Sequence, residues 1–515
     1  MKFAYIVILM LLNSTVLFGQ SAGTLDITFD SDGLLLSNPG SIEDRGVAIA
    51  TQPDGKIVVA GNSALANDRR SIVSRFLPDG SIDLSFGVNG HRILNMQPGV
   101  NDFFNSVLIQ PDGKILLSGP SGSGIIFRTN VARLLANGAL DTGFGINGMK
   151  TYIFSGGSCI PYAMKLDASG RILIGGNESN NLFVLRLLAD GNVDSTFSGD
   201  GIAVDLPPGI FALAFGMCID NVGRIITVGY SFSPFSYMIA RYDSAGALDT
   251  TFGQGGVTLI PKTGLVGLYD CKVQPDGKIL ACGSFDDTGG GSNHDFVILR
   301  LNDNGTPDST FAGDGVLEVP VSNDRDILQS IILQPDGKIM VAGYVGNNTV
   351  AGDFALLRLN SDGSFDTSFG SNGLVLTDFG SSMDIGSMVV LQPDLKVVLC
   401  GWSLQNNKWN MAIARYHTGL FTNANDIDFK TDEFRLFPSP ANNEIWIEWD
   451  KLTQPLEFVS IFDVYGKLAK IFYTPYNNLY QKSVSVYIGD LSSGIYYIKL
   501  NKQQGLGTKF VKIDQ

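Results

Sequence analysis

Gln52-Pro53-Asp54-Gly55-Lys56 is the stretch of sequence that decides the fold of this chain. Proline presets the first corner of a tight turn, aspartate tolerates the second, and glycine takes the position that needs a positive φ. The five residues therefore predict a hairpin turn between two strands. Identical copies lie at 110–114, 274–278 and 334–338, and altered copies lie at 166–171, 220–224 and 392–396.

Two further motifs repeat in step with this turn. Leu25-Asp26-Ile27-Thr28-Phe29 opens a series whose phenylalanines stand at Phe29, Phe86, Phe144, Phe197, Phe252, Phe311 and Phe369. The third apolar stretch of each copy ends in an arginine: Arg75, Arg133, Arg186, Arg241, Arg300, Arg358 and Arg415. Each motif occurs seven times at spacings of 53 to 60 residues, so the chain is built from repeats.

Each repeat contains four short strand patterns, which in the first full copy cover 47–51, 57–60, 72–76 and 91–94. Glycine is abundant, at 61 residues, and no helical period accompanies the strands. A β-helix or linear solenoid normally has a shorter repeat. The sequence therefore predicts an all-β chain with a seven-bladed β-propeller of four-stranded blades over residues 23–418.

These motifs resemble the delta-60 repeat family, a set of bacterial β-propeller repeats with no assigned activity. The resemblance covers roughly 24–418, because Q-P-D-G-K and L-D-x-T-F-G recur in the family's order. Three copies depart from it, with 168–171 and 221–224 altered and Leu395 standing in place of glycine. The resemblance implies the propeller fold and no particular chemistry.

The composition changes after a polar stretch at 419–433, which reads as a linker. Motifs at 436–441, 459–467, 491–497 and 509–512 resemble the type IX secretion C-terminal sorting domain of Bacteroidota, although Ser439 stands where that family usually has asparagine. The resemblance implies that the type IX machinery handles the chain and delivers it to the medium or the outer-membrane cell surface. Alternating apolar strands over 434–515 predict a small Ig-like β-sandwich.

Residues 1–22 have the pattern of a cleavable signal peptide. Lys2 precedes the apolar run 3–12, and small residues follow between Gly19 and Ala22. This run is too short to span a membrane as a helix, and no later stretch is long enough, so we expect no transmembrane segment in the mature chain. The net charge of −14 argues against a nucleic-acid partner.

The five cysteines leave their pairing open. Cys271 and Cys282 flank one hairpin turn, so a disulfide between them remains an alternative, but a one-residue change of register would place them on opposite faces. Cys282 and Cys400 occupy a repeat position that holds alanine or serine elsewhere. This pattern favours free, buried thiols.

The sequence offers no catalytic or cofactor motif. It has three histidines that do not share a strand face, and it lacks a nucleophile elbow, a phosphate loop and zinc-ligand spacing. Asp30-Ser31-Asp32-Gly33 resembles the start of a calcium loop but lacks the downstream glutamate. We therefore expect no metal, no cofactor and no enzymatic activity.

Each repeated arginine precedes the aspartate of the next motif by eight residues, which predicts structural ion pairs rather than a ligand site. We expect bidentate geometry, in which both carboxylate oxygens contact the guanidinium. The unmatched Asp26 and Arg415 then predict ring closure, with 34–36 beside 411–414. The predicted pairs are Arg75–Asp83, Arg133–Asp141, Arg186–Asp194, Arg241–Asp249, Arg300–Asp308, Arg358–Asp366 and Arg415–Asp26.

Segment lengths place the variable loops on one face. Arginine to motif phenylalanine is always 11 residues, whereas the turn position to arginine varies from 16 to 23, so the variable loop joins the second and third strands. Loops that vary in this way often bind ligands. The candidate binding residues on this face are Tyr230, Phe232, Phe285, Asp286, Asp287, His294, Tyr344, Trp402 and Trp409.

The sequence predicts an exported, non-catalytic propeller that binds a protein or glycan partner through this face. A propeller hydrolase or lyase acting on a polysaccharide remains an alternative, and would need carboxylates with raised pKa converging at the central axis. A structural or matrix component is the other alternative.

Overall fold

The computed structural model describes most of the repeat region and the strands of the C-terminal tail. Residues 1–20, most of the predicted linker and Asp287 lie outside the described residues. The described ranges are 21–39, 43–65, 68–96, 99–154, 157–179, 181–204, 206–286, 293–347, 351–381 and 383–420, with 435–437, 441, 443–448, 458–463, 468–473, 483–491, 494–500 and 508–512 in the tail.

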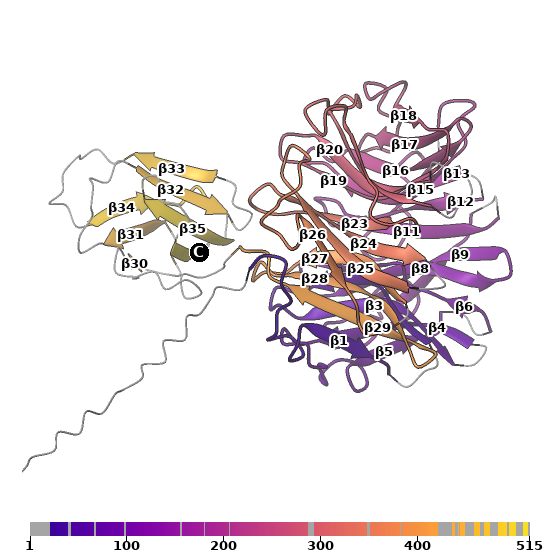
Figure 1. Cartoon of the computed structure of the whole chain (residues 1–515), viewed down its shortest axis with the longest axis horizontal. Helices are drawn as coiled ribbons and strands as arrows, with labels where there is room; N and C mark the ends of the chain where they lie inside the picture. Colours follow the sequence, from indigo (N-terminus) through magenta and orange to yellow (C-terminus); the bar gives the residue numbers. More distant parts are fainter. Residues whose placement is uncertain are drawn as a thin grey trace, which may run out of the picture.

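The strands of the repeat region pair in antiparallel sets of four, except that β6 and β7 share one place in the second set (Figure 1). The strands follow chain order within each set, apart from β1, which joins the last set. The sets are β2 (Glu43–Thr51), β3 (Ile57–Leu65), β4 (Asp68–Phe76) and β5 (His91–Leu94); β6 (Asn101–Asp102) with β7 (Ser106–Ile109), β8 (Ile115–Ser123), β9 (Ile126–Leu134) and β10 (Met149–Tyr152); β11 (Cys159–Leu166), β12 (Ile172–Glu178), β13 (Asn181–Leu187) and β14 (Ile202–Ala203); β15 (Ala212–Ile219), β16 (Ile225–Phe232), β17 (Phe235–Tyr242) and β18 (Val257–Pro261); β19 (Leu265–Val273), β20 (Ile279–Asp286), β21 (Asp295–Leu301) and β22 (Val316–Val319); β23 (Ile327–Leu333), β24 (Ile339–Asn347), β25 (Ala351–Leu359) and β26 (Leu374–Thr377); and β27 (Asp384–Leu391), β28 (Val397–Gln405) and β29 (Lys408–Tyr416) with β1 (Leu34–Ser37). The prediction of an all-β chain of repeated four-stranded sheets is confirmed.

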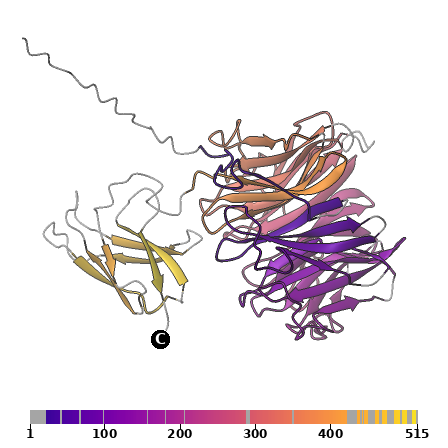
Figure 2. The ribbon, with the colours of Figure 1, turned by 90° about the horizontal axis from the view of Figure 1, so that it is seen from below.

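The first strands of these sets form a closed inner ring. Each contacts the first strand of the next set, through β2, β7, β11, β15, β19, β23 and β27, and β27 contacts β2. Buried hydrophobic clusters fill the space between neighbouring sets, and one of them joins the last set to the first. The sheets therefore pack face to face around a central axis, and Figure 2 shows this stacking from a second side.

The strand nearest the N-terminus completes the last set. β1 pairs antiparallel with β29, with Leu34 opposite Ala414 and Ser37 opposite Met411. Figure 1 shows the indigo β1 beside the orange β29. The sequence-based closure argument predicted this pairing, and it leaves β29 with a partner strand at its outer side.

The repeated turns adopt the backbone that their residues predict. Gly55 and Gly337 have φ of +83° and +84°. Leu395, which replaces glycine in the last copy, has φ of +64°, so this turn keeps the left-handed conformation despite its side chain. The turn is imposed by the strands on either side of it.

The C-terminal tail forms two small antiparallel sheets with a common core. One sheet orders β30 (Arg435–Phe437), β31 (Glu444–Glu448) and β34 (Ser483–Tyr487), and the other orders β33 (Leu468–Tyr473), β32 (Phe458–Asp463), β35 (Gly494–Leu500) and β36 (Thr508–Lys512). Ile445, Val486, Ile461 and Ile498 come from both sheets and are fully buried in one cluster. In the described residues no helix is long and apolar enough to cross a membrane.

Candidate functional site

The repeated arginine and aspartate form an ion pair in every repeat. Arginine Nε lies 2.7–2.8 Å from aspartate Oδ2 in the first six pairs, and Arg415 Nη1 lies 2.5 Å from Asp26 Oδ2. The other oxygen of the aspartate accepts hydrogen bonds from the residue two positions later in the chain. Asp83 Oδ1, for example, accepts from the Ser85 amide (3.0 Å) and from the Ser85 hydroxyl (2.6 Å). The expectation of bidentate pairs is therefore wrong, because the turn after the aspartate occupies its second oxygen.

Six of the seven arginines also donate a hydrogen bond to a backbone carbonyl of the next repeat. Arg186 Nη1 donates to the Ser244 carbonyl at 2.5 Å, and Arg75 and Arg300 donate in the same way to Ala136 and Ser361. The guanidinium stacks over the motif phenylalanine of its own copy, with Arg186 4.5 Å from the Phe197 ring centre. The arginines are at most 7% exposed, so their role is to stabilise the packing of neighbouring sheets.

The last pair uses different guanidinium atoms. Arg415 contacts Asp26 through Nη1, and its Nε donates to Gln392 Oε1 at 2.6 Å. Lys396 Nζ also donates to Asp26 at 2.9 Å, as Lys278 does to Asp308. Burial raises the pKa of Asp26. The hydrogen bonds from His417, Lys396 and Thr28 and the charge of Arg415 lower that pKa by a larger amount, so that it lies well below its usual value. The carboxylate therefore stays ionised where the ring closes.

The variable loops and the repeated turns lie on opposite faces of the propeller. The second strand of each set begins just after a turn and ends at the candidate binding residues, as β20 does between Lys278 and Asp286. Eight extended residues span about 26 Å. The turns lie beside the ion pairs, since Lys278 Nζ is 2.9 Å from Asp308 Oδ2. This geometry agrees with the sequence-based assignment of the faces.

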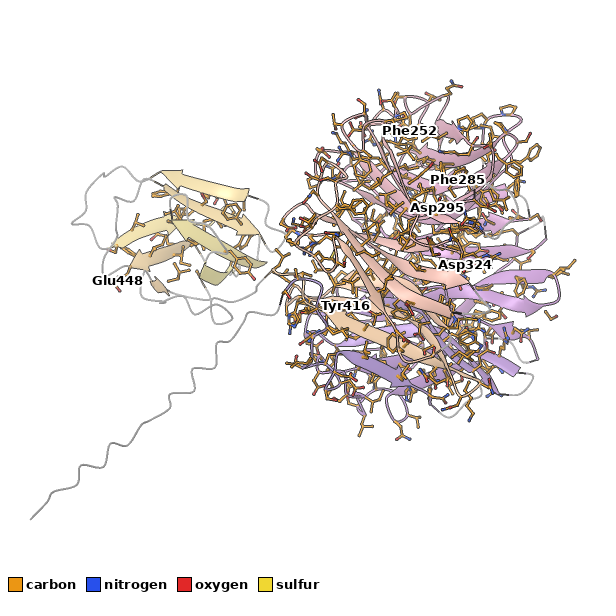
Figure 3. All side chains as sticks on the ribbon, viewed as in Figure 1. Phe252, Phe285, Asp295, Asp324, Tyr416 and Glu448 are labelled. Atoms are coloured by element: carbon orange, nitrogen blue, oxygen red, sulfur yellow. The ribbon has the colours of Figure 1, made fainter. Side chains whose placement is uncertain are left out.

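The structure divides the candidate binding residues into two groups. Tyr230, Phe232, His294, Trp402 and Trp409 are half-buried and reach the surface. The others that the structure describes are buried, with Phe285 8% exposed, Asp286 0% and Tyr344 6%. Phe285 packs in the cluster between two neighbouring sheets, where Figure 3 labels it.

Five aromatic rings, with Phe215 at their centre, lie together on the first and second strands of three neighbouring sets. Phe215 is stacked with Tyr230 at 5.8 Å between ring centres, contacts Tyr162 edge-on at 4.8 Å and lies 5.6 Å from Tyr269. Phe232 meets Tyr230 edge-on at 5.0 Å. We call Tyr162, Phe215, Tyr230, Phe232 and Tyr269 the aromatic cluster. It crosses three neighbouring sheets.

A β-bulge in the first strand supplies three of these rings. Tyr162, Phe215 and Tyr269 are the residues at which the pairing of β11, β15 and β19 shifts register, and a bulge redirects a side chain. Sequence reasoning missed all three. The available signal was their constant place eight residues before the turn position, where the other repeats have Val47, Asn105, Gln329 and Ser387.

A pair of lysines lies further along the same inner strands, toward the turns. Lys272 Nζ is 3.4 Å from Asp270 Oδ2, and this oxygen also accepts the Ile331 amide at 3.1 Å. Burial and the charge of Lys272 lower the pKa of Lys165, which lies on β11. The sequence analysis did not single out these groups.

A second aromatic group lies at the seam between the last and first sets. The Arg45 guanidinium is 5.5 Å from the Trp402 ring centre and 4.9 Å from that of Trp409, and it is paired with Glu43. Trp409 is also the strand-pairing partner of Glu43, where β2 lies beside β29. These tryptophans thus take part in closing the ring.

Three carboxylates approach one another on the variable-loop face. Oxygen atoms of Asp353, Asp378 and Asp384 lie within 4.8 Å of one another, a spacing that could hold a metal ion. Burial raises the pKa of Asp353 and of Asp384. Asp384 accepts hydrogen bonds from the Phe379 amide (2.8 Å) and the Ser381 hydroxyl (2.7 Å), so it organises the connection between β26 and β27.

Comparisons with known proteins agree with this architecture. Five segments match the family described as "Domain of unknown function (DUF5122) beta-propeller", at 52–86, 110–144, 168–197, 274–311 and 334–369. Residues 435–513 match the "Secretion system C-terminal sorting domain". Among proteins with curated descriptions, none matches the chain.

Several solved structures are distantly similar. A catalytically inactive virginiamycin B lyase from Staphylococcus aureus is 12% identical, with a TM-score of 0.45 over 74% of this chain and 98% of its own. Polysaccharide lyase Uly1 is 11% identical, with 0.45 over 79% and 94%. Sqt1 from Chaetomium thermophilum is 18% identical, with 0.41 over 72% and 85%. At this distance, none of them indicates what this chain does. The chain carries β-propeller repeats and a type IX secretion sorting domain, and it is therefore a secreted or outer-membrane cell-surface protein.

Proposed function

We propose that this chain is a non-catalytic propeller that binds a protein or glycan partner outside the cell through its variable-loop face. The aromatic cluster is the observation that carries the proposal. Half-buried rings that lie together across three sheets offer flat apolar platforms with phenol hydroxyls beside them, and both sugars and peptides bind such surfaces.

The rest of the molecule supports binding rather than chemistry. The repeated arginines and aspartates are engaged in ion pairs within each repeat. Three described carboxyls have a raised pKa. Asp353 lies on β25 and Asp384 at the start of β27. The Asp30 amide instead donates to the Asp79 carbonyl beside the turns, so the three do not converge on one site. Burial raises the pKa of Tyr162, Tyr230 and Tyr269, which keeps these phenols neutral as hydrogen-bond donors.

A glycan and protein array probed with the mature full-length chain tests the proposal. Once an array partner is found, we expect Tyr230→Ala and Phe215→Ala each to weaken its binding about fivefold, because a stacking ring contributes on the order of 1 kcal/mol. Phe365→Ala is the matched control, since Phe365 is 39% exposed beside the ion pair on the opposite face. Trp402→Ala tests whether the partner also reaches the seam.

The outcome distinguishes binding from catalysis. Each variant's melting temperature shows whether the sheets remain intact, and Tyr230→Phe separates the ring from the hydroxyl. Unchanged affinity in both Tyr230→Ala and Phe215→Ala would refute this surface. Release of shortened sugar chains from an array polysaccharide would instead support the hydrolase or lyase alternative.

A further inference from the structure

Two cysteine thiols meet between neighbouring sheets. Cys218 lies on β15 and Cys271 on β19, two first strands that contact each other in the inner ring. Their Sγ atoms are 2.8 Å apart, and the residues are 4% and 0% exposed. A disulfide bond is about 2.05 Å long, so the sulfurs need to move less than about 1 Å to form one.

The strand register excludes the hairpin pairing left open by the sequence. Cys271 lies opposite Ala281, whereas Cys282 lies opposite Asp270. Adjacent residues on a strand point to opposite faces, so Cys282 and Cys271 point away from each other. Cys159 and Cys400 instead have backbone carbonyls near their sulfurs, at 3.7 Å and 3.9 Å.

The destination of the chain favours oxidation of such a pair. Exported proteins fold in compartments where disulfides form and persist, while the cytosol keeps thiols reduced. Around Cys271, burial, Cys218 and the charge of Asp270 raise the pKa of the thiol by more than the charge of Lys272 lowers that pKa. Burial raises the pKa of Cys271 in the folded chain, so the reaction belongs to the folding stage, while the sulfurs are accessible.

We propose that Cys218 and Cys271 are joined by a disulfide in the exported protein, as a covalent link between two neighbouring sheets of the propeller. The oxidant is a disulfide-bearing oxidoreductase or oxidised glutathione. One cysteine thiolate attacks the oxidant's disulfide and releases a thiolate, and the second cysteine then displaces the remaining half. The two cysteines lose two protons and two electrons, and the oxidant's disulfide becomes two thiols.

Counting free thiols tests the link. The mature chain is recovered from a type IX-secreting host and denatured in the presence of N-ethylmaleimide, which alkylates free thiols. The number of adducts is then read from the intact mass. We expect three adducts without reductant and five after reduction, since the chain has five cysteines. Cys218→Ser and Cys271→Ser should each give four adducts, whereas the control Cys282→Ser should give two. Peptide mapping should find 218 and 271 in one cross-linked species.

Two further measurements separate the proposal from chance oxidation. The same chain made in a reducing cytosol should give five adducts, and three after refolding with oxidised glutathione. Reduction should lower the melting temperature of the wild type by a few degrees, but not that of the double serine variant. Five adducts in the unreduced exported chain, or a cross-link between another pair, would overturn the proposal.

Discussion

Leu395 holds a backbone conformation that the other repeats give to glycine. Its φ of +64° costs a residue with a Cβ about 1–2 kcal/mol. We expect Leu395→Gly to raise the free energy of unfolding by about 0.5–1 kcal/mol, because relief of strain exceeds the lost contacts of a half-buried side chain. Urea unfolding measures this.

The reciprocal substitution is the control for that turn. A Cβ at Gly337, with φ of +84°, would meet nothing within 4 Å, so Gly337→Ala changes only the backbone. It should lose about 1 kcal/mol. A Leu395→Gly variant no more stable than the wild type would show that the side chain's contacts outweigh its strain.

Arg300 combines three roles in one guanidinium. It pairs with Asp308, donates to Thr310 at 3.0 Å and to the Ser361 carbonyl, and stacks over Phe311. We expect Arg300→Lys to lose about 2–4 kcal/mol of unfolding free energy, because an ammonium group cannot make these contacts together. The exposed Asp276→Ala is the control and should change stability by less than about 0.5 kcal/mol. Equal losses would contradict this stabilising role.

The sequence predicted the partners of these arginines but only part of their geometry. A constant spacing of eight residues identifies the aspartate, because the corner between the third and fourth strands does not vary. The donation to the next repeat depends on how two sheets pack, which no local pattern contains. Tyr162 and Tyr269 were not predicted as site residues for a related reason. A bulge breaks the two-residue alternation by which a strand's faces are assigned.

At the scale of strands, β1 is the element on which the closed ring depends. Removing 21–37 would leave β29 without its partner strand and Arg415 without Asp26. We expect this variant to self-associate and to be cleaved in β27–β29 by proteases, because an unpaired strand edge recruits other chains. Size-exclusion chromatography and limited proteolysis measure both effects.

A peptide supplies the matching control for β1. A synthetic 21–39 peptide added in trans should restore the monomer. The same peptide with Asp26→Ala should do so more weakly, because Arg415 then keeps Gln392 and Asp394 but loses this partner, and a lost hydrogen bond between charged groups costs about 1.5–3 kcal/mol. A truncated chain that stays monomeric and protease-resistant would mean that the ring closes without β1.

Sequence reasoning located the hairpins of each repeat but predicted their strands too short at the ends away from the Pro-Asp-Gly turn. The second and third strands were expected at 57–60 and 72–76, and they extend over β3 (Ile57–Leu65) and β4 (Asp68–Phe76). Polar and charged residues at the ends of a hairpin do not alternate as core residues do. This extension is why Phe285 and Tyr344, assigned to loops, lie on buried strand positions.

Across the whole molecule, acid should weaken every repeat at once. Burial raises the pKa of Asp83 and Asp308, but their hydroxyl, amide and lysine or arginine partners lower that pKa by a larger amount. The net pKa of each motif aspartate therefore lies below its usual value. Because the unfolded pKa of about 3.9 is the higher one, the stabilisation is complete above it and is lost as pH falls toward the folded values. The urea midpoint should therefore be flat from about pH 7 to 5 and fall steeply below about pH 4, less steeply in Asp308→Asn. A midpoint that does not change between about pH 5 and 3 would contradict this.

The two parts of the molecule should also separate in function. Deletion of 434–515 should leave the propeller folded, because, among the described residues, its hydrophobic clusters contain none from the tail. The truncated chain should accumulate in the periplasm, since it lacks the sorting domain. Circular dichroism and cell fractionation measure folding and location against the full chain. Normal amounts of truncated protein outside the cell would count against the sorting role.

The pairing of β1 with β29 sets the order of events during synthesis. Asp26 and Arg415 are 389 positions apart, so β1 leaves the ribosome long before its partner strand exists. Contacts of such long range make folding slow. Until Arg415 has been made, the first and last sets cannot pair through β1, so the ring can close only when synthesis of the repeats is complete.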